Sequence, residues 1–422
     1  MGKILLFWGN SVDKANVDVF VARQAIFDRS RKVWGYELLF RSGASQERFD
    51  GTDESLATRQ VISNSLLAIG LDNLLGDKKA FVNFGREMLL QESASFLPKE
   101  KTVIEILEGV EADSEVMAAI RGLRALGYRI ALDDFVYNSR MEPLLDAANL
   151  VKVEMATPRA QQEAMVRDYH ARGLQMVAEK VETPEEFRWA HQVGYDYFQG
   201  YFFARPTVIQ GRQIPSVKLN CLRLLREAHQ PDIDFDRLTK LISQDVSFSY
   251  KLLRYANSAR FGRSTKIQSV RRALVVLGED GIRKWVSIAA MPIVAQDKPS
   301  ELITHSLVRA RFMEVMGQFT DDSVAERAFL IGLFSLLDAL LDMPLKEVLA
   351  ELNLGPAVAA VLLDEVGPEQ NPLSTLYKLV GRYESGDWDE VNRLADHVGI
   401  PPALISQAYC EALPWADEIL RS

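Results

Sequence analysis

The chain of 422 residues contains little cysteine. Its two cysteines, Cys221 and Cys410, lie far apart and have no partners at the spacing of a metal site. A disulfide framework and a zinc finger are therefore not indicated. Both thiols fit a reducing compartment, where we expect them to be ordinary packing residues.

Long apolar runs are also missing. No stretch approaches the roughly 18 consecutive apolar residues that a membrane-spanning helix requires. The first ten residues hold one lysine and an apolar run of only five residues, 4–8, which is short for a signal peptide. We therefore expect a cytoplasmic protein that has no membrane partner.

Positive charge is in deficit, with a formal net charge of −9. A dedicated nucleic-acid surface needs excess lysine and arginine, so we expect no nucleic-acid partner. A local basic patch such as Arg271–Arg272 is not excluded by the net charge. The remaining composition, 48% hydrophobic and 25% charged, is typical of globular proteins. At this length, two domains with separate cores are expected.

Up to about residue 206, short apolar runs alternate with stretches of helical pattern. The segment 115–127 ends in a glycine suited to a helix C-cap, and Thr183, Pro184 and Glu186 form a capping-box pattern at the start of another helix. Strands alternating with helices predict a parallel sheet with crossover helices. The runs that predict strands span residues 80–84, 103–107, 129–134, 150–155, 175–180 and 195–200.

Each predicted strand carries one polar residue near its C-terminal end. These residues are Asn83, Glu105, Asp133, Lys152, Glu179 and Gln199, at separations of 22, 28, 19, 27 and 20 residues. Each separation fits one strand-plus-helix unit, and in an α/β barrel the C-terminal strand ends converge on one face. We therefore expect the six side chains to meet in one pocket. A doubly wound open sheet is the rival fold, but it would not gather six consecutive strand ends.

After residue 206 the pattern changes. Apolar residues recur at spacings of three and four, strand patterns are absent, and QPDID, NLGPA and GIPPA mark turns. An all-helical second domain is predicted. We expect an N-terminal extension over residues 1–17, a barrel domain over 18–207 and a helical domain over 208–422.

Several segments of the first half resemble the EAL domain, in the order that this family has them. The resemblance implies a modified TIM barrel that hydrolyses the bacterial messenger cyclic di-GMP with two Mg²⁺ or Mn²⁺ ions. The segments are RQAIFDRSRKVWGYELLFRSG (23–43), FVNF (81–84), VIEILE (103–108), ALDDF (131–135), VKVE (151–154), VAEKVET (177–183) and FQGYFFARP (198–206).

The second half resembles the HDOD domain, an all-helical relative of the HD phosphohydrolases. The resemblance lies in LTKLISQDVSFSYKLLRYANSARFG (238–262) and IQSVRRALVVLGEDGIRKWV (267–286). Ser335 and Leu336 stand where those enzymes have their His-Asp pair, which implies a regulatory domain that docks a protein partner. A lone His305 and a lone Asp338 are more typical of a capping or surface pair than of a metal site.

The EAL resemblance also assigns site residues. It implies catalytic roles for Glu37, Lys152 and Glu179, metal coordination by Glu37, Asn83, Glu105, Asp133 and Asp134, and substrate binding by Arg41 and Gln199. Oxygen ligands suit Mg²⁺ or Mn²⁺, and an arginine offers a bidentate fork to phosphate. Independently of the family, several acids and one lysine that converge on one face are the residue types expected in the active site of a two-metal phosphodiesterase.

The sequence departs from the family pattern around this site. The loop over residues 135–140 lacks the glycine that the family has there. Leu107 stands where the family has a threonine, Glu154 where it has an aspartate, and Lys180 where it has a glycine. Losing a residue that orients a metal ligand typically weakens metal binding about 10–100-fold. If no metal is bound, we expect the Lys180 ammonium to reach acids beside Glu179.

Two hypotheses remain. The departures favour a barrel with little or no catalytic activity, which binds cyclic di-GMP or a protein while the helical domain docks a downstream protein. The alternative is an active cyclic di-GMP phosphodiesterase regulated by the helical domain. The family's glycine-containing loop often organises a dimer, so a homodimer is one assembly to test.

Overall fold

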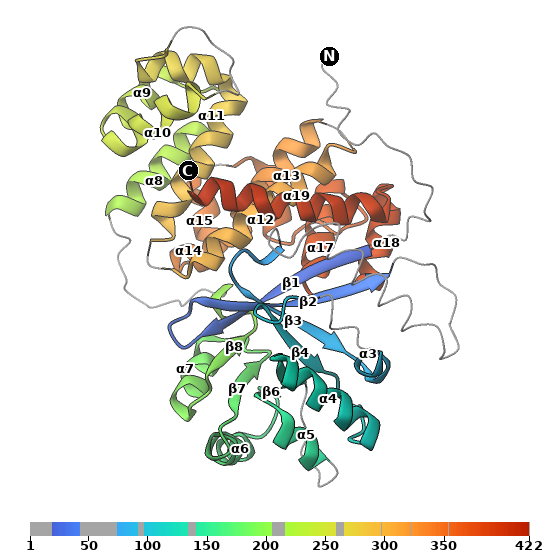
Figure 1. Ribbon diagram of the computed structural model, residues 1–422. Helices are drawn as coiled ribbons and strands as arrows, with labels where there is room; N and C mark the ends of the chain where they lie inside the picture. Colours follow the sequence, from blue (N-terminus) through green and yellow to red (C-terminus); the bar gives the residue numbers. More distant parts are fainter. Residues whose placement is uncertain are drawn as a thin grey trace.

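The computed structural model describes residues 19–42, 74–91, 97–133, 141–204, 216–258, 266–296, 298–320, 322–352 and 354–421. Figure 1 shows a barrel packed against a group of helices that follows it in the chain. Within the described residues, no helix is both long and apolar enough to cross a membrane.

The first domain is a closed barrel whose strands follow one another in chain order. β1 runs antiparallel to both of its neighbours, whereas all other neighbouring strands are parallel. This confirms the modified α/β barrel, and the open-sheet alternative is wrong. The strands are β1 (Val19–Asp28), β2 (Val33–Ser42), β3 (Lys79–Phe84), β4 (Thr102–Ile106), β5 (Arg129–Leu132), β6 (Leu150–Glu154), β7 (Gln175–Glu179) and β8 (Tyr197–Gln199).

Helices connect the parallel strands, and their ends follow local sequence signals. α4 ends at Gly127, which takes the left-handed conformation with φ of 99°. α7 begins with the predicted capping box between Thr183 and Glu186. The helices are α3 (Arg86–Leu90), α4 (Ser114–Leu126), α5 (Glu142–Ala147), α6 (Arg159–Ala171), α7 (Pro184–Val193) and the 3₁₀ helix η4 (Tyr201–Ala204).

An apolar layer fills the barrel below the predicted pocket. Its buried members are Ile26, Phe81, Val103, Ala131, Leu150, Val177 and Tyr197. Six of them, all but Ile26, lie two positions before a predicted polar residue, and residues two apart on a strand face the same side. The polar residues therefore form the next layer towards the C-terminal strand ends, above a dry floor.

The second domain is helical throughout its described residues, as predicted. Figure 1 shows α8 to α11 as one group and the later helices as another beside the barrel. The helices are α8 (Ser216–Ala228), α9 (Phe235–Ser243), α10 (Val246–Ala256), α11 (Val270–Val294), α12 (Ser300–Gly317), α13 (Asp322–Phe334), α14 (Leu337–Leu341), α15 (Leu345–Leu352), α16 (Pro356–Leu362), α17 (Pro372–Glu384), α18 (Trp388–Val398) and α19 (Pro402–Arg421).

The two domains meet where β1 packs against α17 and α19. The Tyr383 hydroxyl donates to the carbonyl of Val21 at 2.9 Å and accepts from its N–H at 3.3 Å. In the described chain, β8 pairs only with Ile26–Asp28 of β1, so the helical domain covers the earlier part of that strand. A second contact joins the hydroxyl of Tyr36 to Glu301 at 3.0 Å.

Candidate functional site

Seven successive strands each bring one polar side chain into a single cluster. The six residues predicted from their spacing meet there, as the geometry of a barrel requires, and Glu37 joins them from β2. The members are Glu37 (β2), Asn83 (β3), Glu105 (β4), Asp133 directly after β5, Lys152 (β6), Glu179 (β7) and Gln199 (β8).

Lys152 lies at the centre of the cluster and is almost fully buried. Its Nζ contacts Glu37 Oε2 at 3.1 Å, Asp133 Oδ1 at 3.0 Å and Glu179 Oε1 at 2.7 Å. It also contacts Glu105, whose side chain is fully buried. An ammonium has three donors, so four carboxylates compete for one cation.

Burial and mutual repulsion favour protons on two of these acids. Burial, with the nearby charge of Glu37, raises the pKa of Glu105 well above its usual value. Burial also raises the pKa of Glu179 to about 8, although Lys152 opposes the shift. Burial alone would lower the pKa of Lys152, but the surrounding carboxylates raise it well above normal. The cluster therefore has more acid than its single ammonium can balance.

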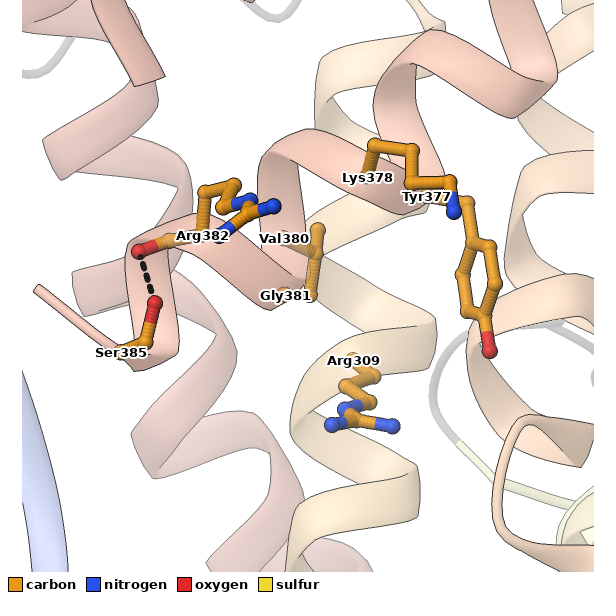
Figure 2. Close-up of a pocket in the computed structure, with 7 residues that line it drawn as sticks. All are labelled: Arg309, Tyr377, Lys378, Val380, Gly381, Arg382 and Ser385. Atoms are coloured by element: carbon orange, nitrogen blue, oxygen red, sulfur yellow. Dashed lines mark hydrogen bonds between the residues drawn. The ribbon is translucent and has the colours of Figure 1, made fainter. Parts of the chain in front are cut away.

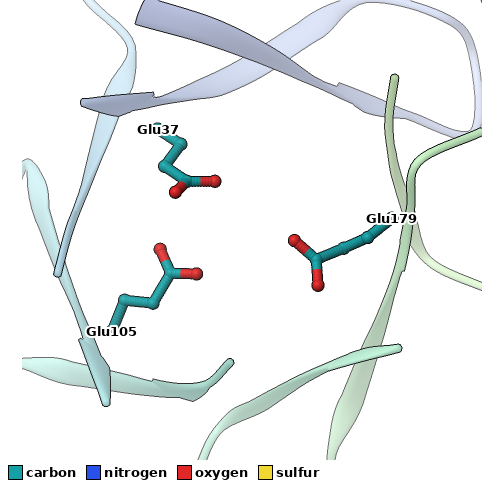
Figure 3. A group of neighbouring side chains, drawn as sticks. All are labelled: Glu37, Glu105 and Glu179. Atoms are coloured by element: carbon teal, nitrogen blue, oxygen red, sulfur yellow. The ribbon is translucent and has the colours of Figure 1, made fainter. Parts of the chain in front are cut away.

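Four buried oxygen atoms in the cluster have no hydrogen-bond partner among the described residues. They are Asn83 Oδ1, Glu105 Oε2, Glu179 Oε2 and Gln199 Oε1. Buried polar atoms are nearly always paired, so these oxygens point to a bound group. Figure 3 shows Glu37, Glu105 and Glu179 pointing toward one another, and one oxygen from each lies within 4.8 Å of the others. Such oxygens fit a hard divalent cation.

Two amides hold Glu37 in place. Asn83 Nδ2 donates to Glu37 Oε1 at 3.2 Å, and Gln199 Nε2 donates to Glu37 Oε2 at 2.8 Å. Gln199 Nε2 also lies 3.1 Å from Gln24 Oε1, which fixes the Gln199 side chain in turn. Gln24 was not predicted as a site residue, because β1 lies outside the repeated strand-plus-helix units.

The turn after β8 fixes the backbone of Gln199. Gly200 has φ of 142°, and a Cβ built on it would lie 2.2 Å from the carbonyl oxygen of Val181. The Val181 amide donates to the carbonyl of Gln199 at 2.9 Å. Only glycine allows this approach between the ends of β7 and β8.

Some predicted residues lie outside what the structure describes. Asp134 and the loop over residues 135–140 fall outside the described residues. Arg41 belongs to β2, but its side chain is outside the described part. Their roles stay predictions.

Two departures from the family pattern contact each other. Lys180 forms an ion pair with Glu154, which lies opposite Glu179 in the register of β6 and β7. Lys180 therefore reaches one acid beside Glu179, but its side chain is 65% exposed and Lys152 holds the buried cluster together. Leu107 follows β4 and is partly exposed, so it offers the cluster no hydroxyl.

At the position of the missing His-Asp pair, the residues Ser335 and Leu336 offer neither a histidine nor a carboxylate. Ser335 accepts a hydrogen bond from Arg309 Nη1 at 3.0 Å, and Leu336 is buried. His305 lies between the domains, where its ring packs 5.6 Å from that of Phe203. Its Nε2 lies 3.7 Å from Glu301 Oε1 and its Nδ1 lies 3.8 Å from Glu384 Oε1, so His305 belongs to a largely buried group of charged side chains rather than to a surface pair.

Comparison with known proteins agrees with both halves of the fold. The EAL domain model matches residues 15–206, and the HDOD domain model matches residues 214–346. The cyclic di-GMP phosphodiesterase CdgJ of Vibrio cholerae is 36% identical over 95% of this chain and 93% of its own length. This chain is an EAL–HDOD protein.

A second relative is the uncharacterized protein YuxH of Bacillus subtilis. It is 34% identical over 95% of this chain and 99% of its own length. Among solved structures, a standalone EAL protein of Vibrio cholerae with cyclic di-GMP bound is 25% identical. The alignment covers 46% of this chain and 93% of that one, with a TM-score of 0.38.

Proposed function

We propose that the EAL barrel is a cyclic di-GMP phosphodiesterase that uses Mg²⁺ or Mn²⁺. One observation carries this proposal: buried carboxylate and amide oxygens without partners surround a cluster in which acids outnumber the ammonium. A divalent metal would satisfy both the oxygens and the charge. The name of the 36% identical relative CdgJ supports the same substrate.

The residues of the cluster would have different roles in catalysis. Glu37, Asn83, Glu105, Asp133 and Glu179 would hold the metal, which supplies Lewis-acid stabilisation and lowers the pKa of a bound water. In hydrolysis, water adds to one phosphorus, the bond from phosphorus to the ribose oxygen breaks, and a linear dinucleotide results.

Lys152 would stabilise the negative charge that develops on the phosphoryl oxygens, because its ammonium is already fixed by the strands and needs no reorganisation. Gln199 would orient Glu37 through the hydrogen bond from Gln199 Nε2 to Glu37 Oε2. Its Oε1 atom, which has no partner among the described residues, would stay available in the pocket. The dry apolar layer beneath would keep these interactions strong.

Binding without turnover is the second candidate. Lys152 contacts all four carboxylates, so its ammonium competes with a metal for the same oxygens. Leu107 supplies no hydroxyl to orient them. In this case the barrel would bind nucleotide, and the HDOD domain, which we propose docks a protein partner, would transmit the signal.

Titration of the purified full-length protein with cyclic di-GMP, with turnover followed in parallel, tests both candidates. With Mn²⁺ present we expect hydrolysis, and we expect Glu105→Gln to lower its rate about a hundred-fold or more. Glu163→Gln, a change at an exposed glutamate of α6, is the matched control and should leave the rate unchanged. Tight binding without product would support the second candidate, and absence of both would overturn the proposal.

A further inference from the structure

The C-terminal turn of α17 touches the barrel through several nearby residues. Tyr383 bonds Val21, and the carbonyl of Glu384 accepts a hydrogen bond from Gln24 Nε2 at 3.2 Å. Gly386 follows with φ of 72°, so close to β2 that a Cβ there would lie 3.1 Å from the side chain of Leu39. This turn of the helical domain therefore contacts both β1 and β2.

Gln24 joins that contact to the metal-binding cluster. The Nε2 end of its amide donates to α17, while its Oε1 end accepts from Gln199, which in turn donates to Glu37. One primary amide can do both because its nitrogen donates and its oxygen accepts. The carbonyl of Glu384 belongs to the last turn of α17, where carbonyls lack partners within the helix. Gln24 thus caps a helix of one domain and orients a site residue of the other.

The helical end of this chain of contacts is anchored in the HDOD core. Arg309 of α12 binds the carboxylate of Glu384 in a bidentate pair, with distances of 2.8 Å from Nε to Oε1 and 2.6 Å from Nη2 to Oε2. Its Nη1 donates to Ser335 at the end of α13. The position of α17 therefore depends on how α12, α13 and α17 pack against one another.

The Arg309–Glu384 pair lies beside a cavity. Arg309 lines this cavity of about 280 Å³ together with the α17 residues Tyr377, Lys378 and Arg382. Figure 2 draws these lining residues. Packed interiors change between discrete arrangements, and this cavity lies directly beside the Arg309–Glu384 pair that fixes α17.

We propose that Gln24 is a positioning residue that makes the metal affinity of the EAL site depend on the position of α17 in the helical domain. A protein that binds the HDOD domain and shifts α17 withdraws the carbonyl of Glu384 from Gln24. Gln199 then loses its support and Glu37 its fixed orientation. This inference rests on the proposed metal site, and it adds the route by which the second domain regulates it.

A double-mutant cycle tests whether the coupling passes through Gln24. Gln24→Leu removes both hydrogen bonds, and Glu384→Gln weakens the pair with Arg309 while keeping the shape of the side chain. The matched control is Tyr36→Phe, which removes another hydrogen bond between the domains, the one to Glu301. The readout is the Kd of the full-length protein for Mn²⁺, measured by calorimetry.

We expect Gln24→Leu to raise the Kd about ten-fold, the lower end of the cost of losing a residue that orients a metal ligand. Glu384→Gln should raise it about three-fold in the wild-type background and have no further effect with Gln24→Leu, because both changes act along one path. Tyr36→Phe should leave it unchanged. An unchanged Kd in Gln24→Leu, or an equal effect of Glu384→Gln in both backgrounds, overturns the proposal.

Amide hydrogen exchange without metal separates this inference from the proposed function. Glu384→Gln should speed exchange in the segment 197–200 in the wild-type background but not with Gln24→Leu. If the wild type binds no Mn²⁺ but Glu384→Gln changes exchange in this background-dependent way, the metal site is refuted and the link between the domains stands. If exchange in that segment is the same in all variants, the link itself is refuted.

Discussion

At the scale of single residues, the barrel site is governed by charge balance. Lys152 is the one ammonium inside a buried group of carboxylates, whereas Lys180 pairs with Glu154 at the rim. Removing one partner of a buried charge cluster leaves uncompensated charge, while an exposed pair contributes little. These two lysines therefore make a matched comparison.

We expect Lys152→Met to lower the free energy of unfolding by about 3 kcal/mol or more in metal-free protein at pH 8. Lys180→Met should change it by less than about 1 kcal/mol. Urea unfolding of both variants with a chelator present measures the difference. Equal losses in the two variants would show that Lys152 does not hold the cluster together.

The raised pKa of Glu179, about 8, predicts a pH dependence for metal binding. Below that pH the metal-free carboxyl keeps its proton, which a metal must displace, so affinity for Mn²⁺ should rise as the pH increases from 6.5 to 8.5. The expected slope is about ten-fold per pH unit below the pKa, for one proton released. Calorimetry in buffers of different ionisation enthalpy counts the protons. A flat affinity over this range would contradict the prediction.

At the scale of elements, β8 and the turn behind it place Gln199. Gly200→Ala would force a side chain against the backbone of Val181 at a φ that alanine rarely adopts. We expect a loss of about 3 kcal/mol in the free energy of unfolding, from backbone strain and steric clash together. Gly122→Ala, in the exposed face of α4 with open space around it, should instead stabilise by about 0.5–1 kcal/mol. Thermal unfolding of both variants checks this contrast, and a tolerated Gly200→Ala would contradict it.

The elements that could be predicted from the sequence are those with local or repeating signals. Caps such as Gly127 and Thr183 are local signals, and the polar residue at each parallel strand end repeats with the strand-plus-helix unit. That repeat was enough to predict which side chains converge. The antiparallel pair of β1 and β2 has no helix between its strands, so the alternation missed it and only the family resemblance covered it. Gln24 was overlooked for the same reason.

At the scale of the whole molecule, the sequence predicted a barrel followed by a helical domain but not how the two meet. Val21 and Tyr383 are 362 positions apart, and no periodicity encodes a contact of that separation. The same holds for Gln24 and Glu384, whose bond joins the two domains close to the proposed metal site. Docking is a property of three-dimensional packing, so it appears only in the structure.

The Tyr383 contact has a consequence for the barrel on its own. By bonding both the N–H and the carbonyl of Val21, the phenol takes the place of a neighbouring strand along the early part of β1. A barrel cut free of its helices would expose an unprotected sheet edge there, ready to pair with the same edge of another molecule. The helices after the barrel therefore cover this edge, and we expect a fragment ending near residue 207 to self-associate through β1.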